Sequence, residues 1–154
     1  MAKKKILLMS DDLRMHSGVA TVSKDIVFET LHQYDWVQMG GAIKHPEAGK
    51  VIDMSEHLQK DFGIKDGYLR IYPVDGYGNE DLLRDVIAME KPDAILAGMG
   101  GQTALNIAMA LAHDGSLDEL GVELIGCNLA SIDEAEDRDL FKKVCEEIDL
   151  PVCK

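Results

Sequence analysis

Short apolar runs alternate along this chain with segments in which apolar residues recur every three or four positions. The runs predict buried strands, and the spaced segments predict amphipathic helices. Strands are expected at residues 5–10, 35–40, 68–72, 93–97 and 122–126, and helices at about residues 19–33, 55–62, 79–90, 102–113 and 137–148. This alternation with short loops predicts the α/β class, as a single Rossmann-like domain whose parallel sheet of about five strands carries helices on both faces.

Local signals refine these boundaries. Pro73 is expected to end the third strand, and Ser55 and Asn79 are expected to cap the helices that follow them. The stretch Ser131-Ile132-Asp133-Glu134 has the pattern of a helix capping box. The first helix is expected to bury one apolar face, made of Val19, Val22, Ile26, Val27, Thr30 and Leu31.

Composition agrees with one globular domain. The chain has 154 residues, of which 46% are hydrophobic and 29% charged. No apolar run approaches the roughly 20 residues that span a bilayer. The basic start is followed by only four apolar residues before Ser10, which favours a buried strand over a signal peptide. The odd set of Cys127, Cys145 and Cys153 lacks metal-ligand spacing and predicts a reducing, cytoplasmic setting.

The net charge of −12 is unevenly distributed. Residues 1–97 contain 12 basic and 16 acidic side chains, whereas residues 98–154 contain 4 basic and 12 acidic ones. Such a surface disfavours nucleic acids and anionic membranes as partners. A small-molecule nucleotide is the expected partner because α/β folds hold nucleotides at the carboxyl edge of the sheet. The charge itself is most simply interpreted as an acidic solvated face.

The most informative motif is Gly98-Met99-Gly100-Gly101-Gln102-Thr103-Ala104-Leu105-Asn106, which joins the fourth strand to a helix with apolar positions at Leu105, Ala108, Met109 and Ala112. Glycines here let the backbone approach an anion at a helix N-terminus, which makes Gly98, Gly100 and Gly101 candidate binding residues. The alternative is that they permit tight strand-to-helix packing, with Gln102 or Thr103 as the cap. The motif is not a complete dinucleotide fingerprint, and no P-loop lysine follows it.

From about residue 90 onward, several motifs follow one family. They are Lys91-Pro92-Asp93-Ala94-Ile95-Leu96, residues 98–106, Leu120-Gly121-Val122-Glu123-Leu124-Ile125-Gly126, and Ala135-Glu136-Asp137-Arg138 with Phe141. Residues 90–154 resemble the large chain of carbamoyl-phosphate synthase, at the end of the Rossmann-like domain that precedes its ATP-grasp fold. The resemblance implies ATP as cofactor, with Mg²⁺ in the intact family, and implies that Arg138 contacts ATP. The rest of that site is expected beyond residue 154. Without the resemblance, Arg138 would be a surface residue paired with Glu134 or Asp137.

The first 96 residues follow a different pattern. Ile6-Leu7-Leu8-Met9-Ser10-Asp11-Asp12-Leu13-Arg14, Ser17-Gly18-Val19-Ala20 and Tyr34-Asp35-Trp36-Val37-Gln38-Met39-Gly40-Gly41-Ala42 resemble the amino-terminal domain of GT-B glycosyltransferases of tailed bacteriophages. The synthase family would have a glycine-rich loop after its first strand, where this chain has Ser10-Asp11-Asp12-Leu13-Arg14. We therefore expect one domain of dual origin, with residues 3–96 and 90–154 from two sources. A natural recombinant, a designed chimera and a misassembled reading frame all stay open.

Polar residues gather in the loop after the first strand, namely Asp11, Asp12, Arg14, His16 and Gly18. This loop lies at the carboxyl edge of the sheet, where sites form in α/β folds. Asp12 and His16 are the candidate general bases toward an acceptor hydroxyl, in the glycosyltransferase interpretation. Paired carboxylates also suit a metal or a helix cap, and His16 could simply be solvated. His45, Asp53 and His57 match no common metal site, so none is predicted.

Three functions follow from these observations. The first is the pre-ATP-grasp portion of a carbamoyl-phosphate synthase-like large chain, a ligase that makes carbamoyl phosphate from bicarbonate, ammonia and two ATP. The second is the acceptor-side half of a phage glycosyltransferase, which would use a nucleotide-sugar donor held by another domain. The third is a non-catalytic, chimeric fold module. Residues 1–154 alone are expected to be inactive in all three, because an ATP-grasp or donor domain is required.

Overall fold

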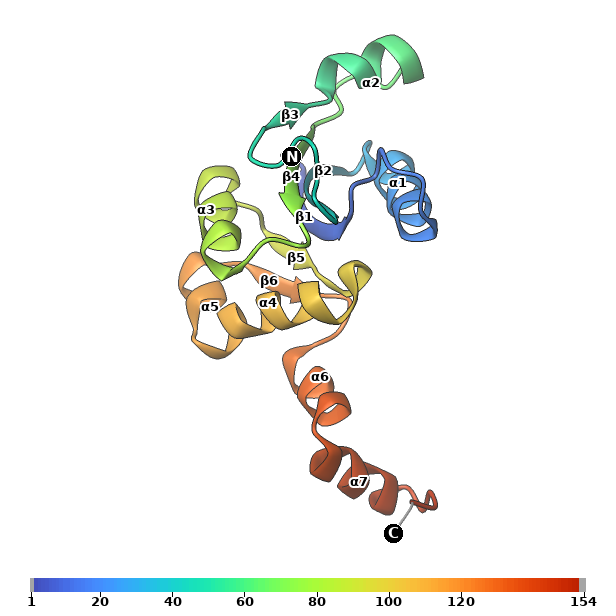
Figure 1. Ribbon diagram of the computed structural model, residues 1–154, viewed down its shortest axis with the longest axis vertical. Helices are drawn as coiled ribbons and strands as arrows, with labels where there is room; N and C mark the ends of the chain where they lie inside the picture. Colours follow the sequence, from blue (N-terminus) through green and yellow to red (C-terminus); the bar gives the residue numbers. More distant parts are fainter. Residues whose placement is uncertain (1, 153–154) are drawn as a thin grey trace.

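A six-stranded sheet runs through the centre of the protein in the computed structural model, which describes residues 2–152 (Figure 1). The strand order is β3-β4-β2-β1-β5-β6, and all neighbours are parallel except β3 and β4. The strands are β1 (Lys4–Asp11), β2 (Tyr34–Ala42), β3 (Ile52–Asp53), β4 (Leu69–Asp75), β5 (Ala94–Leu96) and β6 (Glu123–Ile125). The predicted α/β class and single Rossmann-like domain are confirmed, with six strands in place of about five. The additional strand is the two-residue β3, which is too short for a periodic signal.

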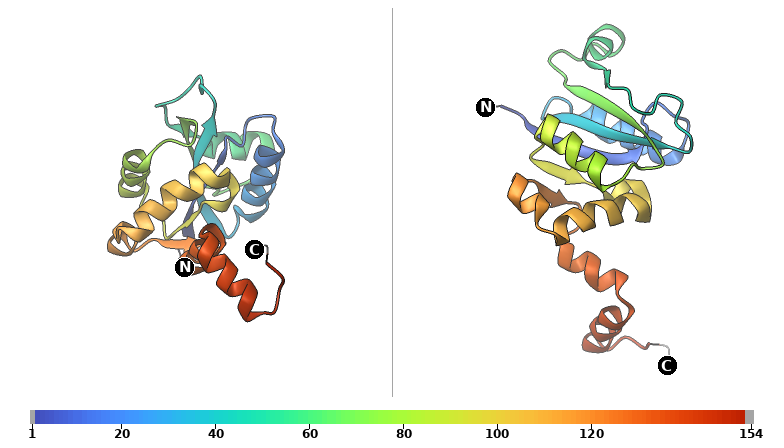
Figure 2. Two further views of the ribbon diagram at one scale, coloured as in Figure 1. Left: turned by 60° about the horizontal axis from the view of Figure 1, so that its bottom comes forward. Right: turned by 60° about the vertical axis from the view of Figure 1, so that its left-hand side comes forward.

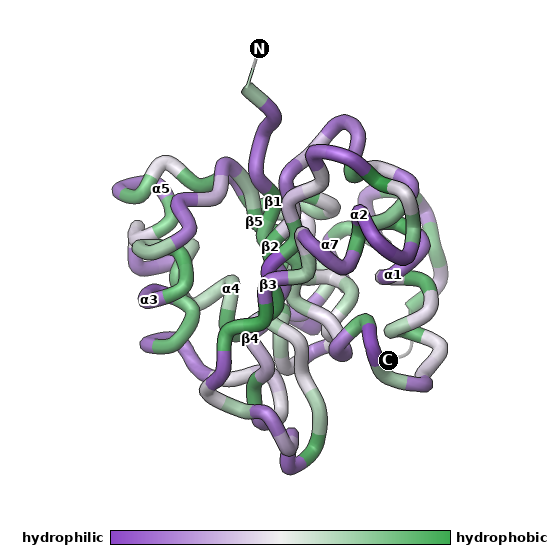
Figure 3. Tube along the Cα trace, turned by 90° about the horizontal axis from the view of Figure 1, so that it is seen from above, coloured by the Kyte–Doolittle hydropathy of each residue, from purple (hydrophilic) through white to green (hydrophobic). Residues whose placement is uncertain are grey.

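Helices cover both faces of the sheet. They are α1 (Gly18–Thr30), α2 (Ser55–Phe62), α3 (Glu80–Glu90), α4 (Gly101–His113), α5 (Ser116–Leu120), α6 (Leu129–Glu136) and α7 (Arg138–Glu147), with a 3-10 turn η1 (Gly98–Gly100) before α4. Figure 3 shows α1 and α2 on one side of the strands and α3, α4 and α5 on the other. Figure 2 shows that α6 and α7 instead extend away from the sheet as an arm. No helix in residues 2–152 has the length and apolar character needed to cross a bilayer.

The core has two parts because strand side chains alternate between the two faces. Leu7 and Met9 of β1 pack with the residues of α3, α4 and α5, whereas Ile6 and Leu8 pack with those of α1 and α2. This double burial explains why the strands appear in the sequence as continuous apolar runs.

The strand predicted at residues 68–72 is β4, and it continues through Pro73, contrary to the prediction that this proline would end it. Pro73 pairs in register with Gly40 of β2, and its carbonyl accepts a hydrogen bond from the N–H of Gly49 on the outer side. In a strand the N–H and C=O of one residue point the same way, so the missing N–H of Pro73 also faces outward. The proline therefore breaks no bond between β4 and β2.

The buried face of α1 differs from the predicted one. Ala20, Ser23 and Val27 face the sheet, whereas Val19 and Val22 are partly exposed. The apolar pattern placed the stripe one residue too early, because Ser23, a polar residue, occupies a core position on the true face. The Ser23 hydroxyl has no hydrogen-bond partner among the described residues.

Two predicted caps are also corrected. Ser55 is the first residue of α2 and its N–H donates to Asp53, so Ser55 does not cap the helix. Asn128 caps α6 by accepting the N–H of Ser131, which places the expected capping box inside the helix. The Asn79 cap of α3 is confirmed, since its side chain accepts the N–H of Leu82.

Thermal unfolding is expected to be one cooperative transition, because β1 pairs with β2 on one side and with β5 on the other. Trp36, only 3% exposed, reports on the first half of the chain by fluorescence. Far-ultraviolet circular dichroism reports on all helices. We expect the two midpoints to coincide. Two separate midpoints would show that the segments before and after residue 90 fold independently.

Candidate functional site

The carboxyl edge of the sheet gathers the loops that follow β1, β2, β4 and β5. The chain reverses its direction of strand addition between β1 and β5, which is the topological switch point of the sheet. Ligands of open α/β sheets bind at such an edge. The loop after β1 carries most of the predicted polar candidates, and the structure separates them into two groups.

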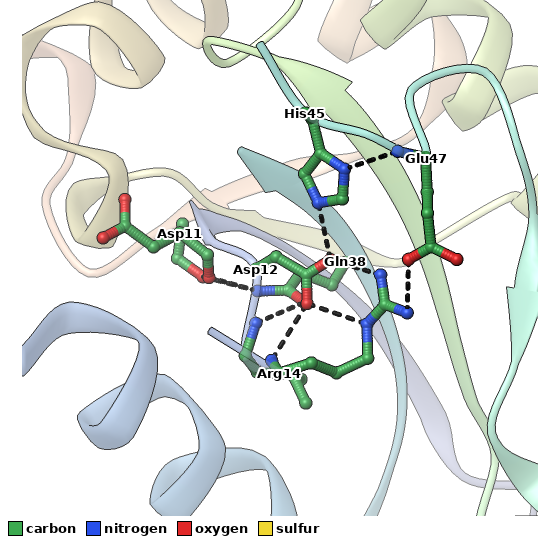
Figure 4. A network of polar contacts seen from close by, with 8 residues as sticks. Asp11, Asp12, Arg14, Gln38, His45 and Glu47 are labelled. Carbon is green, nitrogen blue, oxygen red and sulfur yellow. Dashed lines mark hydrogen bonds and ion pairs between the residues drawn. The ribbon is translucent and has the colours of Figure 1, made fainter. Parts of the chain in front are cut away.

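Asp12 belongs to a buried network that joins the loops after β1 and β2 (Figure 4). Its carboxylate accepts the Nη2–H of Arg14 at 2.6 Å and approaches Nε2 of His45 at 3.1 Å. Arg14 also pairs with Glu47 at 2.8 Å. Burial by itself raises the pKa of Asp12, but the hydrogen bonds and charge of Arg14, with a contribution from His45, hold it below its ordinary value. Asp12 is therefore ionised and fully occupied by protein partners.

The tautomer of His45 follows from its two neighbours. Its Nδ1 accepts the backbone N–H of Glu47 at 3.1 Å, so the proton lies on Nε2 and is donated to Asp12. Both ring nitrogens are therefore occupied within the protein, and this buried Asp–His pair joins the loop after β1 to the loop after β2. The side chain of Gln38, on β2, also holds the end of β1 by donating to Ser10 Oγ and to the Asp11 carbonyl, each at 2.8 Å.

Asp11 points away from this network (Figure 4). It lines a cavity of about 510 Å³. One carboxylate oxygen accepts the hydroxyl of Ser17 and the other that of Tyr77, each at 2.6 Å. Burial, and then the Asp11 carboxylate, raise the pKa of Tyr77 to about 12, so its hydroxyl stays a donor. The remaining lining residues are Met15, His16, Gly41, Ala42, Ile43 and Gly76.

Asp11 and His16 thus line one cavity, whereas Asp12 belongs to the buried network. His16 is exposed at the cavity mouth, and Gly18 begins α1 with open space around it. A catalytic role for Asp12 or His16 stays a prediction, and the burial of Asp12 makes Asp11 the carboxylate that a ligand can reach.

The glycine turn folds as η1 followed by α4, with no side-chain cap at the helix start. A Cβ on Gly100 would lie 2.3 Å from the Cβ of Ala104 and 3.0 Å from the Met9 carbonyl. This glycine is therefore needed for close packing of α4 on β1. Gly98 has open space around it, and Gly101 has φ of +63°. Anion binding by this turn stays a prediction.

The expected caps of α4 have other contacts. Neither Gln102 nor Thr103 caps the helix; Gln102 instead donates to Asn106 at 2.9 Å and to Glu136 at 2.6 Å. The second of these bonds connects the first turn of α4 to the end of α6.

Arg138 opens α7 and lines a hollow of about 600 Å³ on the arm, with Phe141, Lys142, Cys145, Pro151 and Val152. Among residues 2–152 it makes no ion pair, so the expected pairing with Glu134 or Asp137 is absent. Asp137 instead caps α7 by accepting the N–H groups of Asp139 and Leu140. The guanidinium of Arg138 is thus available to a ligand.

The other candidate ligands of a metal are engaged separately. His57 pairs with Asp61 on α2 at 2.7 Å, and Asp53 pairs with Arg70 at 3.2 Å. Within the part of the chain that the structure describes, no three side chains of His, Cys, Asp or Glu form a group that could hold a metal ion. Cys127 is exposed and Cys145 buried, both as free thiols, and Cys153 lies outside the described residues.

Of the lining residues that the sequence did not single out, Tyr77 and Gly41 contribute most to the shape of the cavity. Tyr77 lies in the turn Gly76-Tyr77-Gly78, which carries only a turn signal. Gly41 is the second-last residue of β2, and a Cβ there would lie 2.2 Å from the Gly76 carbonyl and 2.8 Å from the Tyr77 ring. The doubled glycine at positions 40 and 41 was the available signal, since a strand interior rarely tolerates it without a close backbone contact.

Part of the chain matches a known protein family. Residues 73–134 match the family model described as the carbamoyl phosphate synthase preATP-grasp domain. The match begins within β4 rather than near residue 90, and it includes α3, β5, α4, α5, β6 and most of α6. It ends at Glu134, so Arg138 lies outside it.

The fold of the chain is also found in a solved structure, described as the biotin carboxylase domain of a single-chain bacterial carboxylase. The TM-score is 0.59 at 14% sequence identity, over 97% of this chain and 30% of that one. At this identity the likeness shows the fold alone. The chain therefore spans about a third of the length of that carboxylase. The glycosyltransferase resemblance of residues 3–96 stays a prediction.

Proposed function

We propose that this chain is the amino-terminal, pre-ATP-grasp portion of a carbamoyl-phosphate synthase-like large chain. The family match over residues 73–134 carries the proposal, and the fold likeness over 97% of the chain supports it. The residues before 73 supply β1 and β2, which complete the sheet on which the matched segment packs. In the intact enzyme, ATP would phosphorylate bicarbonate, ammonia would give carbamate, and a second ATP would give carbamoyl phosphate.

The arm made by α6 and α7 supports this proposal through its exposed apolar side chains. Phe141 is 54% exposed, Ile148 61% and Leu150 53%, and the arm extends away from the sheet (Figure 1). Several large exposed apolar side chains within ten residues of a projecting segment favour contact with another domain or protein. We expect an ATP-grasp domain to cover it in the assembled enzyme and to supply the Mg²⁺ and phosphate contacts that phosphoryl transfer requires.

Removing the Arg138 side chain should weaken ATP binding. The purified chain should bind MgATP at millimolar concentration, because a guanidinium without an ion pair is suited to phosphate oxygens. Arg138→Ala should reduce this affinity by roughly tenfold, the effect of about one charged hydrogen bond. Isothermal calorimetry measures both values.

Lys143→Ala is the matched control, since Lys143 is an exposed cation on the same helix that does not line the hollow. It should change the affinity far less than Arg138→Ala. No ATP binding by the chain at millimolar concentration would overturn the role of Arg138. We also expect no carbamoyl phosphate formation by residues 1–154 alone, and measurable ATP-dependent formation would contradict that expectation.

The second candidate function is the acceptor-side half of a glycosyltransferase. One observation favours it, which is that Asp11 and His16 line a cavity at the loop where an acceptor site was expected. Calorimetry with methyl α-D-glucopyranoside as a model acceptor tests this alternative, because the nucleotide-sugar donor would be held by another domain. If neither ATP nor the acceptor sugar binds, the third candidate, a non-catalytic chimeric fold module, is favoured.

A further inference from the structure

The cavity at the ends of β1, β2 and β4 is not used by the proposed ATP-dependent function. Arg138 and the arm lie on another part of the molecule, beyond β6 (Figure 1). The volume of about 510 Å³ is within the range of small-molecule sites, which combine apolar walls with a few convergent polar groups.

Asp11 provides the acceptors in this cavity. An ionised carboxylate has about four lone-pair sites, two on each oxygen. Ser17 occupies one site on one oxygen, and Tyr77 occupies one on the other. One acceptor site is therefore left on each oxygen. Two hydroxyl groups on neighbouring ring carbons have the spacing to donate to the two oxygens of one carboxylate, which is how acidic residues bind ribose in dinucleotide sites.

The walls select against anions and accommodate a ring. The described residues that line the cavity include neither lysine nor arginine, and Asp11 is the lining residue of fixed charge. Met15, Ile43 and the Tyr77 ring supply apolar surface. Ile43 is 92% exposed, which leaves its side chain free to cover one face of a ring. A neutral ring fits this environment better than a phosphate.

The site is also held in place before a ligand arrives. Arg14 pairs with both Asp12 and Glu47, which ties the loop after β1 to the loop after β2. Gly41 allows the turn at Gly76 and the Tyr77 ring to approach the end of β2. Binding therefore requires little ordering of the protein, which favours affinity for a small ligand.

We propose that this cavity binds a ring with two neighbouring hydroxyl groups, with Asp11 accepting one hydrogen bond from each hydroxyl and the apolar walls covering the ring. The ribose of a nucleoside and a free hexose share this chemistry. Because neither needs a phosphate, the site is independent of the ATP contact proposed for Arg138.

Nuclear magnetic resonance titration of the full chain tests the proposal with three neutral probes: adenosine, 2′-deoxyadenosine and methyl α-D-glucopyranoside. Adenosine at millimolar concentration should shift the amide signals of Ser17, Ala42 and Tyr77. Its 2′-deoxy analogue, which lacks one of the two hydroxyls, should bind roughly tenfold more weakly. Binding of the glucoside in place of adenosine would assign the site to a free sugar. The proposal would be overturned if neither adenosine nor the glucoside shifted these amide signals. Equal binding of adenosine and 2′-deoxyadenosine would also overturn it.

Asp11→Asn should weaken binding of the active probe by roughly tenfold or more, because one charged acceptor is replaced by a donor. Asp118→Asn, an exposed carboxylate on α5, is the matched control and should leave binding unchanged. If Asp11→Asn fails to fold, Ile43→Ser gives a second test at an exposed wall position and should weaken binding severalfold. Unchanged binding in the folded variants would overturn the assignment. Arg138→Ala should leave this binding intact, which separates it from the ATP test.

Discussion

Replacing Glu90 with alanine should lower the free energy of unfolding by about 3–5 kcal/mol, the cost of breaking a buried ion pair by removing one partner. Glu90 ends α3, and its side chain is 2% exposed. The sequence shows it only as the last residue of a helix, yet it is the centre of a polar cluster at the amino edge of the sheet.

Four donors surround the Glu90 carboxylate. The hydroxyls of Tyr72 and Tyr68 donate at 2.6 and 2.7 Å, and the cations of Lys5 and Arg70 approach at 3.1 and 3.2 Å. Burial, and then the Glu90 carboxylate, raise the pKa of Tyr72 to about 12, so the tyrosine stays a donor. Without Glu90, the buried Tyr72 hydroxyl, the half-buried Tyr68 hydroxyl and two cations lose their shared acceptor. Urea unfolding measures the loss.

Asp85→Ala is the matched control, since Asp85 lies on the same helix but is exposed. It should change stability by no more than about 0.5 kcal/mol. A loss below about 1 kcal/mol for Glu90→Ala would show that the cluster is not a determinant of stability.

The same carboxylate should make stability depend on pH in the acid range. Burial raises the pKa of Glu90, but the hydroxyls of Tyr72 and Tyr68 and the Lys5 ammonium outweigh it and hold the pKa below its ordinary value. The contribution of Glu90 to the free energy of unfolding is therefore fully present above its unfolded pKa of about 4.3, and it is lost as the pH falls through its folded pKa. Glu90→Gln should consequently show a shallower loss of stability on acidification than the unchanged chain.

Gly100→Ala should destabilise the protein by about 1–3 kcal/mol, the usual cost of forcing an extra methyl group into a packed core. The new Cβ would lie 2.3 Å from the Cβ of Ala104, 3.0 Å from the Met9 carbonyl and 3.2 Å from the Tyr77 ring. Since φ at Gly100 is −97°, the backbone itself tolerates alanine, and the effect is one of packing. Thermal or urea unfolding gives its size.

Gly98→Ala provides the control within the same turn. Gly98 has no atom within 4 Å of a built Cβ and does not have positive φ. Alanine there should change stability by about 0.5 kcal/mol or less. If both variants behave alike, the close packing of α4 on β1 is not the reason for glycine at position 100.

These outcomes bear on the interpretation of the glycine turn. A large effect at Gly100 alone would show that this glycine serves the packing of α4, one of the two roles that the motif left open. The site at the carboxyl edge depends on the same contact, because Gly100 lies against Tyr77, which donates to Asp11. Packing and the proposed ligand site are therefore coupled at this position.

The sequence by itself determined the fold class and most of the elements of this protein. Strands buried on both faces leave unbroken apolar runs, and amphipathic helices leave a regular period, so both are local signals. Pro73 misled because its effect depends on which side of β4 has a neighbour, and that is a property of the sheet. Ser23 misled because one polar residue sits at a core position of α1.

Only the tertiary structure decided which polar residues share a site. Asp11 is the last residue of β1, and Asp12 follows it with its N–H still bonded to the Gly41 carbonyl, so the alternation of strand side chains continues to Asp12. That alternation sends Asp12 to Arg14 and His45 and Asp11 to the cavity with Tyr77, 66 residues away. The partners of Glu90 come from β1 and β4 in the same way. Local pattern specifies elements, whereas partners distant in the chain meet only when the sheet order and register are fixed.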